Sequence, residues 1–218
     1  MKRSRSSKRE IFASEVAPSP DAPRWTRGAF AARGLLAGGG LAAGGVVGGW
    51  RATAAAPAPS TALDRKIFNF ALLLERLQAA FYREAIEAGA LRGELREFAE
   101  VVGGHERDHV EFLERALGSR ADKPPTFEFG SATREQARFV DTAVLLENTG
   151  VAAYNGQAAN LTKRSLAAAA EIVSVEGRHA AWISDLAGRN PAPRAVDPGA
   201  TADAIAARLK STGFIKGS

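Results

Sequence analysis

The chain has 218 residues, of which 45% are hydrophobic, 7% are aromatic and none is cysteine. This composition is typical of a globular protein with an apolar core, and it excludes disulfides, Cys-ligated zinc or iron–sulfur sites and a thiol nucleophile. The formal charge is +5, but residues 1–54 hold 9 Lys and Arg against 3 Asp and Glu, whereas the remainder holds 20 against 21. Because the basic excess belongs to the N-terminal segment, we expect no nucleic-acid partner.

The N-terminal segment has the layout of an export signal. Residues 1–33 are basic and polar, Gly34–Trp50 is uncharged and glycine-rich, and Ala52-Thr53-Ala54 is an A-x-A cleavage sequence. This order is typical of a secretory signal peptide. The long basic region resembles a twin-arginine signal, although Gly28 stands where that motif carries its second arginine. We therefore interpret residues 1–58 as a twin-arginine-like signal and linker.

This interpretation predicts that the protein is exported to the periplasm, the cell envelope or the medium. After cleavage we expect no stable membrane span. The alternative is an uncleaved membrane anchor. The uncharged segment, however, has only 17 residues, eight of which are glycine, whereas a membrane span needs about 20 apolar residues.

Apolar residues recur at steps of three and four after Ser60, which predicts amphipathic helices. Two breaks, Gly89–Gly93 and Asn160–Lys163, are only a few residues long, so the helices they join should be antiparallel neighbours. The predicted helices cover about 61–88, 92–117, 132–159 and 164–187, with a further short helix near 201–210.

The connection between the second and third helices is longer. Gly118–Gly130 contains Pro124-Pro125, which excludes a helix. Thirteen extended residues reach about 43 Å, and a 26-residue helix is about 39 Å long, so this linker can run the length of the bundle. The predicted fold is therefore an all-α four-helix bundle with one long crossover, formed by residues 59–190, and a C-terminal extension over 191–218.

An internal repeat carries the candidate chemistry. The first and third helices share the pattern LLE-x6-Y, and the second and fourth share E-x-x-H. The glutamates lie about 15 residues from the middle of each short turn, and one residue rises about 1.5 Å, so all four should lie at one level. The repeated residues are Glu75, Tyr82, Glu106 and His109 in one half, and Glu147, Tyr154, Glu176 and His179 in the other.

Four carboxylates at one level inside a bundle are costly to bury unless cations lie between them. A glutamate from each of two helices and an E-x-x-H from each of the other two form a di-iron or di-manganese carboxylate site. We expect two Fe or Mn ions, with iron favoured and zinc tolerated, and bridging roles for Glu106 and Glu176. The predicted ligands are Glu75, Glu106, His109, Glu147, Glu176 and His179. The alternative is that Glu75 and Glu147 lie on the surface.

Tyr82 and Tyr154 follow Glu75 and Glu147 by two helical turns on the same face. Either they are aromatic residues of the core, or they have a redox or hydrogen-bonding role beside the metals.

With these residues the chain resembles the ferritin-like domain family of exported and desiccation-related proteins. The resemblance covers about residues 64–187 and implies a ferritin-like bundle with a dinuclear carboxylate site, whose six ligand positions are all present here. The matching stretches are DRKIFNFALLLERLQAAFYREA, HERDHVEFLERALG, PPTFEFG, TAVLLENTGVAAYNGQA and AAAAEIVSVEGRHAAWISDL.

A competing motif overlaps the second helix. Residues 105–109 read H-E-x-x-H, which in zinc proteases supplies two ligands and a general base. The repeat argues against a protease, because Val175 stands where His105 would recur and the nearest third ligand, Glu128, lies in the proline-rich linker. We expect His105 to lie in solvent or beside a ligand.

The sequence thus predicts an exported metalloprotein that reacts with O2 or peroxide in oxidative or desiccation stress. Peroxide removal, oxidation of ferrous iron and oxidation of a small substrate are all compatible with it, and no catalytic residue is assigned. The alternative is a non-catalytic structural stress protein of the cell envelope on the same bundle. Assembly into an iron-storage shell or another homo-oligomer is left open.

Overall fold

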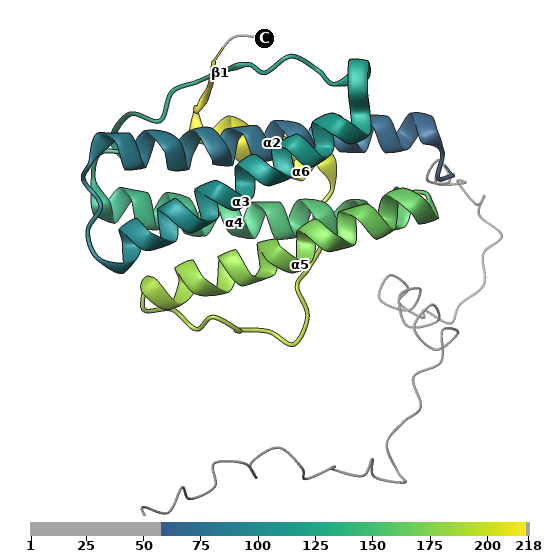
Figure 1. Ribbon diagram of the computed structural model, residues 1–218. Coiled ribbons are helices and arrows are strands. Elements are labelled where there is room, and N and C mark those ends of the chain that lie inside the picture. Colours follow the sequence, from purple (N-terminus) through teal and green to yellow (C-terminus); the bar gives the residue numbers. More distant parts are fainter. Residues whose placement is uncertain (1–57, 217–218) are drawn as a thin grey trace, which may run out of the picture. The chain divides into compact units, whose positions relative to one another are not determined.

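The structure is a computed structural model that describes residues 58–216 (Figure 1). Residues 1–57 of the predicted signal and linker lie outside the described residues. The helices are α2 (Thr61–Ala88), α3 (Glu94–Leu117), α4 (Gln136–Gln157), α5 (Lys163–Leu186) and α6 (Ala202–Thr212), and short 3-10 turns cover Gly118–Arg120, Gly130–Ala132 and Ala158–Asn160.

Helices α2 to α5 form the predicted four-helix bundle with one long crossover (Figure 1). The most extensive packing is between α2 and α3 and between α4 and α5. The crossover is fixed along α2, where Asn69 bonds the backbone of Arg120 and Asp122 at 3.0 and 2.8 Å. Arg76 also donates to the Asp122 carbonyl at 2.6 Å. The linker therefore returns the chain to the opposite end of the bundle before α4 begins.

Two features of the crossover were not predicted. Strand β1 (Thr126–Phe127) pairs antiparallel with β2 (Ile215–Lys216), so the C-terminal end of the chain holds the linker. The expected start of the third helix near 132 is also wrong, because α4 begins at Gln136. The hydroxyl of Thr133 donates to Glu84 Oε1 at 2.7 Å and contacts the Gly130 carbonyl at 3.2 Å, which maintains a turn at these positions.

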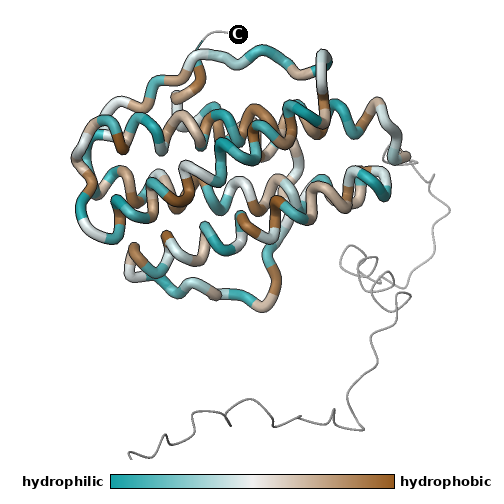
Figure 2. The backbone as a smooth tube through the Cα atoms, viewed as in Figure 1, coloured by the Kyte–Doolittle hydropathy of each residue, from teal (hydrophilic) through white to brown (hydrophobic). Residues whose placement is uncertain are grey.

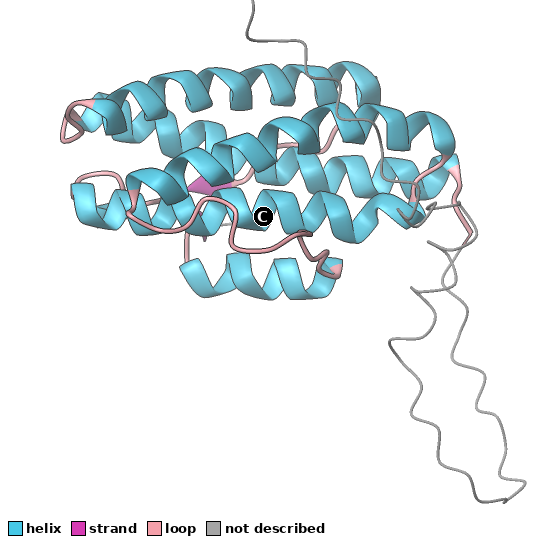
Figure 3. Ribbon diagram, turned by 90° about the horizontal axis from the view of Figure 1, so that it is seen from below, coloured by secondary structure: helices cyan, strands magenta, loops and turns pink. Residues whose placement is uncertain are grey.

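The C-terminal helix packs on the bundle from outside (Figure 3). It begins after the N-cap Thr201, whose side chain accepts a hydrogen bond from Ala204 N at 3.2 Å. Its buried residues Ile205 and Leu209 pack in the larger of the two hydrophobic clusters of the bundle. The segment before it passes very close to α4: a Cβ on Gly156 would lie 1.8 Å from the Ala200 carbonyl oxygen. Glycine at this position permits the contact.

Hydrophobic and hydrophilic residues alternate along the bundle helices (Figure 2). The buried hydrophobic side chains form two clusters. On α2, one cluster contains Ile67, Phe68, Ala71 and Leu72, and the other contains buried residues from Leu74 onward, so the boundary between them falls near Glu75. The polar layer described below therefore lies between two apolar regions. Within residues 58–216 no helix has the length and apolarity needed to cross a membrane.

Asp64 joins the start of α2 to the start of α5. Its carboxylate accepts hydrogen bonds from Thr162 N at 2.9 Å, Thr162 Oγ1 at 2.6 Å and Ser165 Oγ at 2.7 Å. Burial alone would raise the pKa of Asp64, but these hydrogen bonds outweigh it and hold the pKa below its usual value. The side chain thus fixes the start of α5, which is about one hundred residues away in sequence, against the start of α2.

Replacing Asp64 with Asn should destabilise the fold by about 1–3 kcal/mol, because the half-buried donors Thr162 and Ser165 lose a charged acceptor. Chemical denaturation of the metal-free protein measures this effect. The difference from the wild type should shrink as pH falls through the lowered pKa of Asp64, since protonation removes the same charge. Asp197→Asn, at an exposed position, should be neutral. Equal losses in the two variants would contradict the assignment.

Candidate metal centre

The structure brings the six predicted ligand side chains together in one buried layer, with contributions from all four bundle helices. Two sets of four groups have ligand atoms within 4.8 Å of one another, and they share Glu106 and Glu176. We call them the Glu75 set and the Glu147 set. The Glu75 set contains Glu75, Glu106, His109 and Glu176, and the Glu147 set contains Glu106, Glu147, Glu176 and His179.

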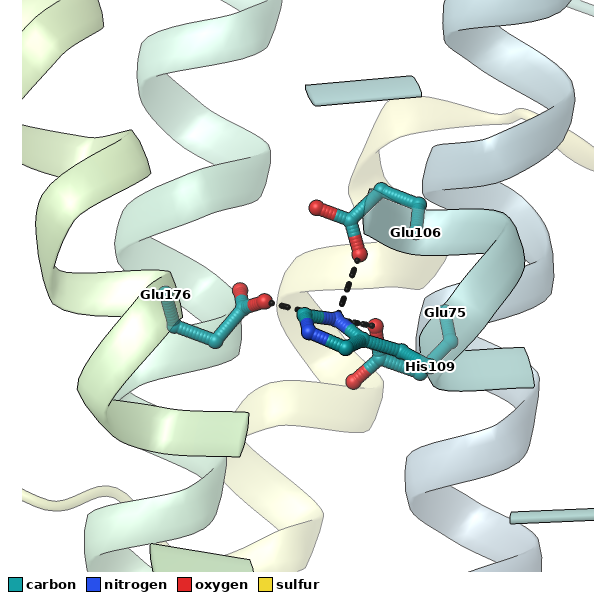
Figure 4. Close-up of side chains that lie close together, drawn as sticks. All are labelled: Glu75, Glu106, His109 and Glu176. Atoms are coloured by element: carbon teal, nitrogen blue, oxygen red, sulfur yellow. Dashed lines mark hydrogen bonds and ion pairs between the residues drawn. The ribbon is translucent and has the colours of Figure 1, made fainter. Parts of the chain in front are cut away.

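In the Glu75 set, one imidazole nitrogen faces three carboxylates from three helices (Figure 4). His109 Nδ1 lies 3.2 Å from Glu75 Oε2, 3.2 Å from Glu106 Oε2 and 3.3 Å from Glu176 Oε1. A single N–H can serve one of these oxygens well, so the arrangement has more acceptors than protons.

The Glu147 set repeats this arrangement around the second histidine. His179 Nδ1 lies 3.0 Å from Glu106 Oε1 and 3.3 Å from Glu147 Oε2, with Glu176 Oε1 at 3.8 Å. The two oxygens of Glu106 thus face different histidines. A carboxylate in this position is suited to bridging two ions.

The buried polar atoms of the layer are not fully satisfied by protein hydrogen bonds. Within residues 58–216, the buried side-chain atoms without a partner are Glu106 Oε1, Glu147 Oε2, both Glu176 oxygens and His179 Nδ1. Unpartnered buried carboxylates are strongly unfavourable. Because each of these atoms belongs to a predicted ligand and faces the same small region, the donor set fits two oxygen- and nitrogen-ligated cations.

The charges of the layer perturb its titration. Burial raises the pKa of Glu106 and Glu176 well above the usual carboxyl value, and neighbouring carboxylates add to the effect. Burial would lower the pKa of His109, but Glu106, Glu176 and Glu75 raise it to about 12. Burial also opposes ionisation of Glu75, yet His109 leaves its pKa below the usual value. Protons thus supply part of the positive charge that the carboxylates need.

The two tyrosines bond the outer oxygens of the layer and are buried in the core. Tyr82 OH donates to Glu147 Oε1, and Tyr154 OH donates to Glu75 Oε1 at 2.6 Å. Burial, reinforced by the adjacent carboxylate, raises the pKa of each phenol well above its usual value, so both remain donors at neutral pH. Of the two predicted roles, the structure shows both burial in the core and hydrogen bonding to predicted ligands.

Two contributors were missed by the sequence analysis. Gln78 is buried and donates to Glu147 Oε1 at 3.1 Å. Its equivalent in the second half of the repeat is Gly150, where a Cβ would lie 2.4 Å from Glu176 Oε2. Gln78 therefore supports the predicted ligand Glu147, whereas the absence of a side chain at Gly150 leaves space for the predicted ligand Glu176. Aligning the two halves residue by residue would have drawn attention to this pair.

His105 lies beside a predicted ligand, which was one of the two expectations for it. Its ring stacks on that of His179 at a centroid distance of 5.2 Å, and its Nδ1 lies 2.9 Å from His179 Nε2. His105 belongs to neither ligand set. This arrangement agrees with the repeat and not with the zinc-protease interpretation, in which His105 and His109 would share one ion.

An open pocket of about 460 Å³ between α3 and α5 leads to the histidine side of the layer. It gives a small molecule an approach to both predicted ligand histidines from outside the bundle. Its walls are formed by His105, Asp108, His109, Val175, Arg178, His179 and Trp182.

Comparison with known families places these features in context. Residues 63–189 match the ferritin-like domain family, and this stretch covers more than half of the chain and every residue of the two ligand sets. The chain belongs to this family, and its mainly helical bundle confirms the predicted fold class. No match to the chain was found among curated proteins.

The raised pKa values predict how the metal-free protein responds to pH. The folded chain keeps protons on Glu106 and Glu176 at higher pH than the unfolded chain does, so its stability should fall as pH rises from about 5 to about 8. The raised pKa of His109 acts in the same direction. Glu106→Gln/Glu176→Gln should flatten this dependence and stabilise the metal-free fold at the higher pH by at least about 1.4 kcal/mol, the equivalent of one pKa unit.

Thermal unfolding after removal of metals by a chelator measures this effect. Glu97→Gln/Glu171→Gln, two exposed glutamates on the same helices, is the matched control and should retain the wild-type dependence. A double glutamine variant at the buried positions that is less stable than the wild type throughout this range would show that the layer is not dominated by excess negative charge.

Proposed function

We propose that this protein is an exported metalloprotein whose buried carboxylate–histidine layer holds two iron or manganese ions and reacts with O2 or peroxide. The observation that carries the proposal is the set of unpartnered oxygen and nitrogen atoms of Glu106, Glu147, Glu176 and His179, all directed into one region. Iron or manganese ions bound in such a ligand set supply redox chemistry toward O2 or peroxide.

The side chains would fix the ions and limit what reaches them. Glu106 and Glu176 belong to both ligand sets, so their carboxylates would bridge, while Glu75 and Glu147 each serve one set. The phenols of Tyr154 and Tyr82 bond these two outer carboxylates and hold their orientation. The apolar clusters flank the layer on both sides, so access is by the pocket between α3 and α5.

The pocket between α3 and α5 supports a reactive centre over a purely structural one. A structural ion is usually enclosed by its ligands, whereas a reactive one needs a route for the oxidant. Here His105, Asp108 and Arg178 line the open approach to the ligand histidines. The pocket admits molecules of the size of peroxide or O2 without any displacement of the helices.

Metal analysis of the full chain, produced with sufficient iron and manganese, tests the site. We expect about two ions per chain by mass spectrometry, and their loss in Glu106→Ala/Glu176→Ala but not in Glu97→Ala/Glu171→Ala. The metal-loaded wild type should then consume peroxide or oxidise ferrous iron, and the first variant should not. A loaded protein that is inert in both assays would favour the non-catalytic stress protein.

Export is part of the proposal and rests on the sequence of the N-terminal segment. The basic region, the uncharged glycine-rich region and Ala52-Thr53-Ala54 support it. Expression of the full chain in a bacterial host with a twin-arginine pathway should give periplasmic protein whose first residue, by mass spectrometry, is Ala55. A full-length chain confined to the cytoplasm would contradict export.

A further inference from the structure

The two halves of the repeat differ at two positions beside the ligands. Gln78 and Gly150 are equivalent, and so are His105 and Val175. The polar member of each pair contacts the Glu147 set: Gln78 bonds Glu147, and His105 lies on His179. The Glu75 set has Tyr154 as the counterpart of Tyr82 but has no counterpart of the other two contacts. The ligand sets are thus chemically unequal.

The unpartnered atoms follow the same division. Glu147 Oε2 and His179 Nδ1 belong to the Glu147 set alone, and the other three unpartnered atoms belong to Glu106 and Glu176, which the two sets share. Among residues 58–216, no unpartnered atom belongs to the Glu75 set alone. In the Glu75 set, by contrast, His109 Nδ1 is within hydrogen-bond distance of Glu75 Oε2 and Glu106 Oε2. A cation entering the Glu147 set breaks no protein hydrogen bond of Glu147 Oε2 or His179 Nδ1, although it displaces the close approach of His179 Nδ1 to Glu106 Oε1. A cation entering the Glu75 set must replace the hydrogen bonds of His109 Nδ1.

From this asymmetry we propose that the Glu147 set binds the first metal ion more tightly than the Glu75 set binds the second, and that His105 is the positioning residue responsible. This inference rests on the proposed function, since it concerns the same two ions. His105 Nδ1 and His179 Nε2 lie 2.9 Å apart, and in the tautomer in which His179 Nε2 donates this hydrogen bond, His179 Nδ1 is a lone pair directed at the carboxylates. Stacking of the two rings also restricts rotation of the ligand.

The repeat provides its own matched variants. His105→Val gives the second helix the residue that the fourth helix carries, and Val175→His does the reverse beside His109. His105 is exposed, so its replacement leaves the buried core intact. His105→Asn restores an acceptor near the position of Nδ1 without restoring an imidazole ring.

Calorimetric titration of the metal-free full chain with Mn²⁺ measures the affinity of each step. We expect two steps in the wild type, and a weakening of the tighter one by about 10- to 100-fold in His105→Val. His105→Asn should recover most of this loss, and Val175→His should strengthen the weaker step. Glu147→Gln should remove the tighter step and Glu75→Gln the weaker one, which assigns each step to its ligand set.

Other outcomes of the titrations would contradict the inference or its stated cause. Two ions bound with equal affinity, or a His105→Val titration that superimposes on the wild type, would overturn the inference and leave the proposed metal centre standing. Failure of His105→Asn to recover affinity would show that the hydrogen bond is not the cause. A wild-type chain that binds no Mn²⁺ would overturn both the inference and the proposed function.

Discussion

Repulsion among four buried carboxylates is the constraint on which the rest of this structure depends. Four glutamates converge from four helices at one level, between two apolar clusters. They are Glu75, Glu106, Glu147 and Glu176. Their burial lowers the stability of the metal-free fold, and protons, histidines and tyrosine hydroxyls relieve the repulsion only in part. Cations within the layer would convert an unfavourable arrangement into a strongly bound site.

The helices and the ligand layer could be predicted because their signals are local or repeated. Apolar spacing gave the four long helices and the last short one to within a few residues, and the proline pair identified the crossover. The level of the glutamates followed from counting residues away from two short turns, since helical rise is constant. The chain was also assigned to its family from these stretches, and the match over residues 63–189 confirms that assignment.

The remaining features depend on contacts that no local pattern reports. Asp64 bonds residues at the start of a distant helix, and the final strand pairs with the crossover, because the bundle brings those segments together. Gln78 and His105 lie within the repeat, but the search for shared residues passed over them. They stand at positions where the two halves carry different residues. The early start expected for the third helix failed because Thr133 bonds Glu84 across the bundle and holds a turn.

Anomalous X-ray diffraction from crystals of the metal-loaded protein, recorded at the iron and manganese absorption edges, tests the metal centre most directly. Two peaks inside the bundle are predicted, one within the Glu75 set and one within the Glu147 set, with Glu106 and Glu176 contacting both. Anomalous density confined to the protein surface, or its absence from the layer in a protein loaded with metal, would contradict a dinuclear centre at these residues.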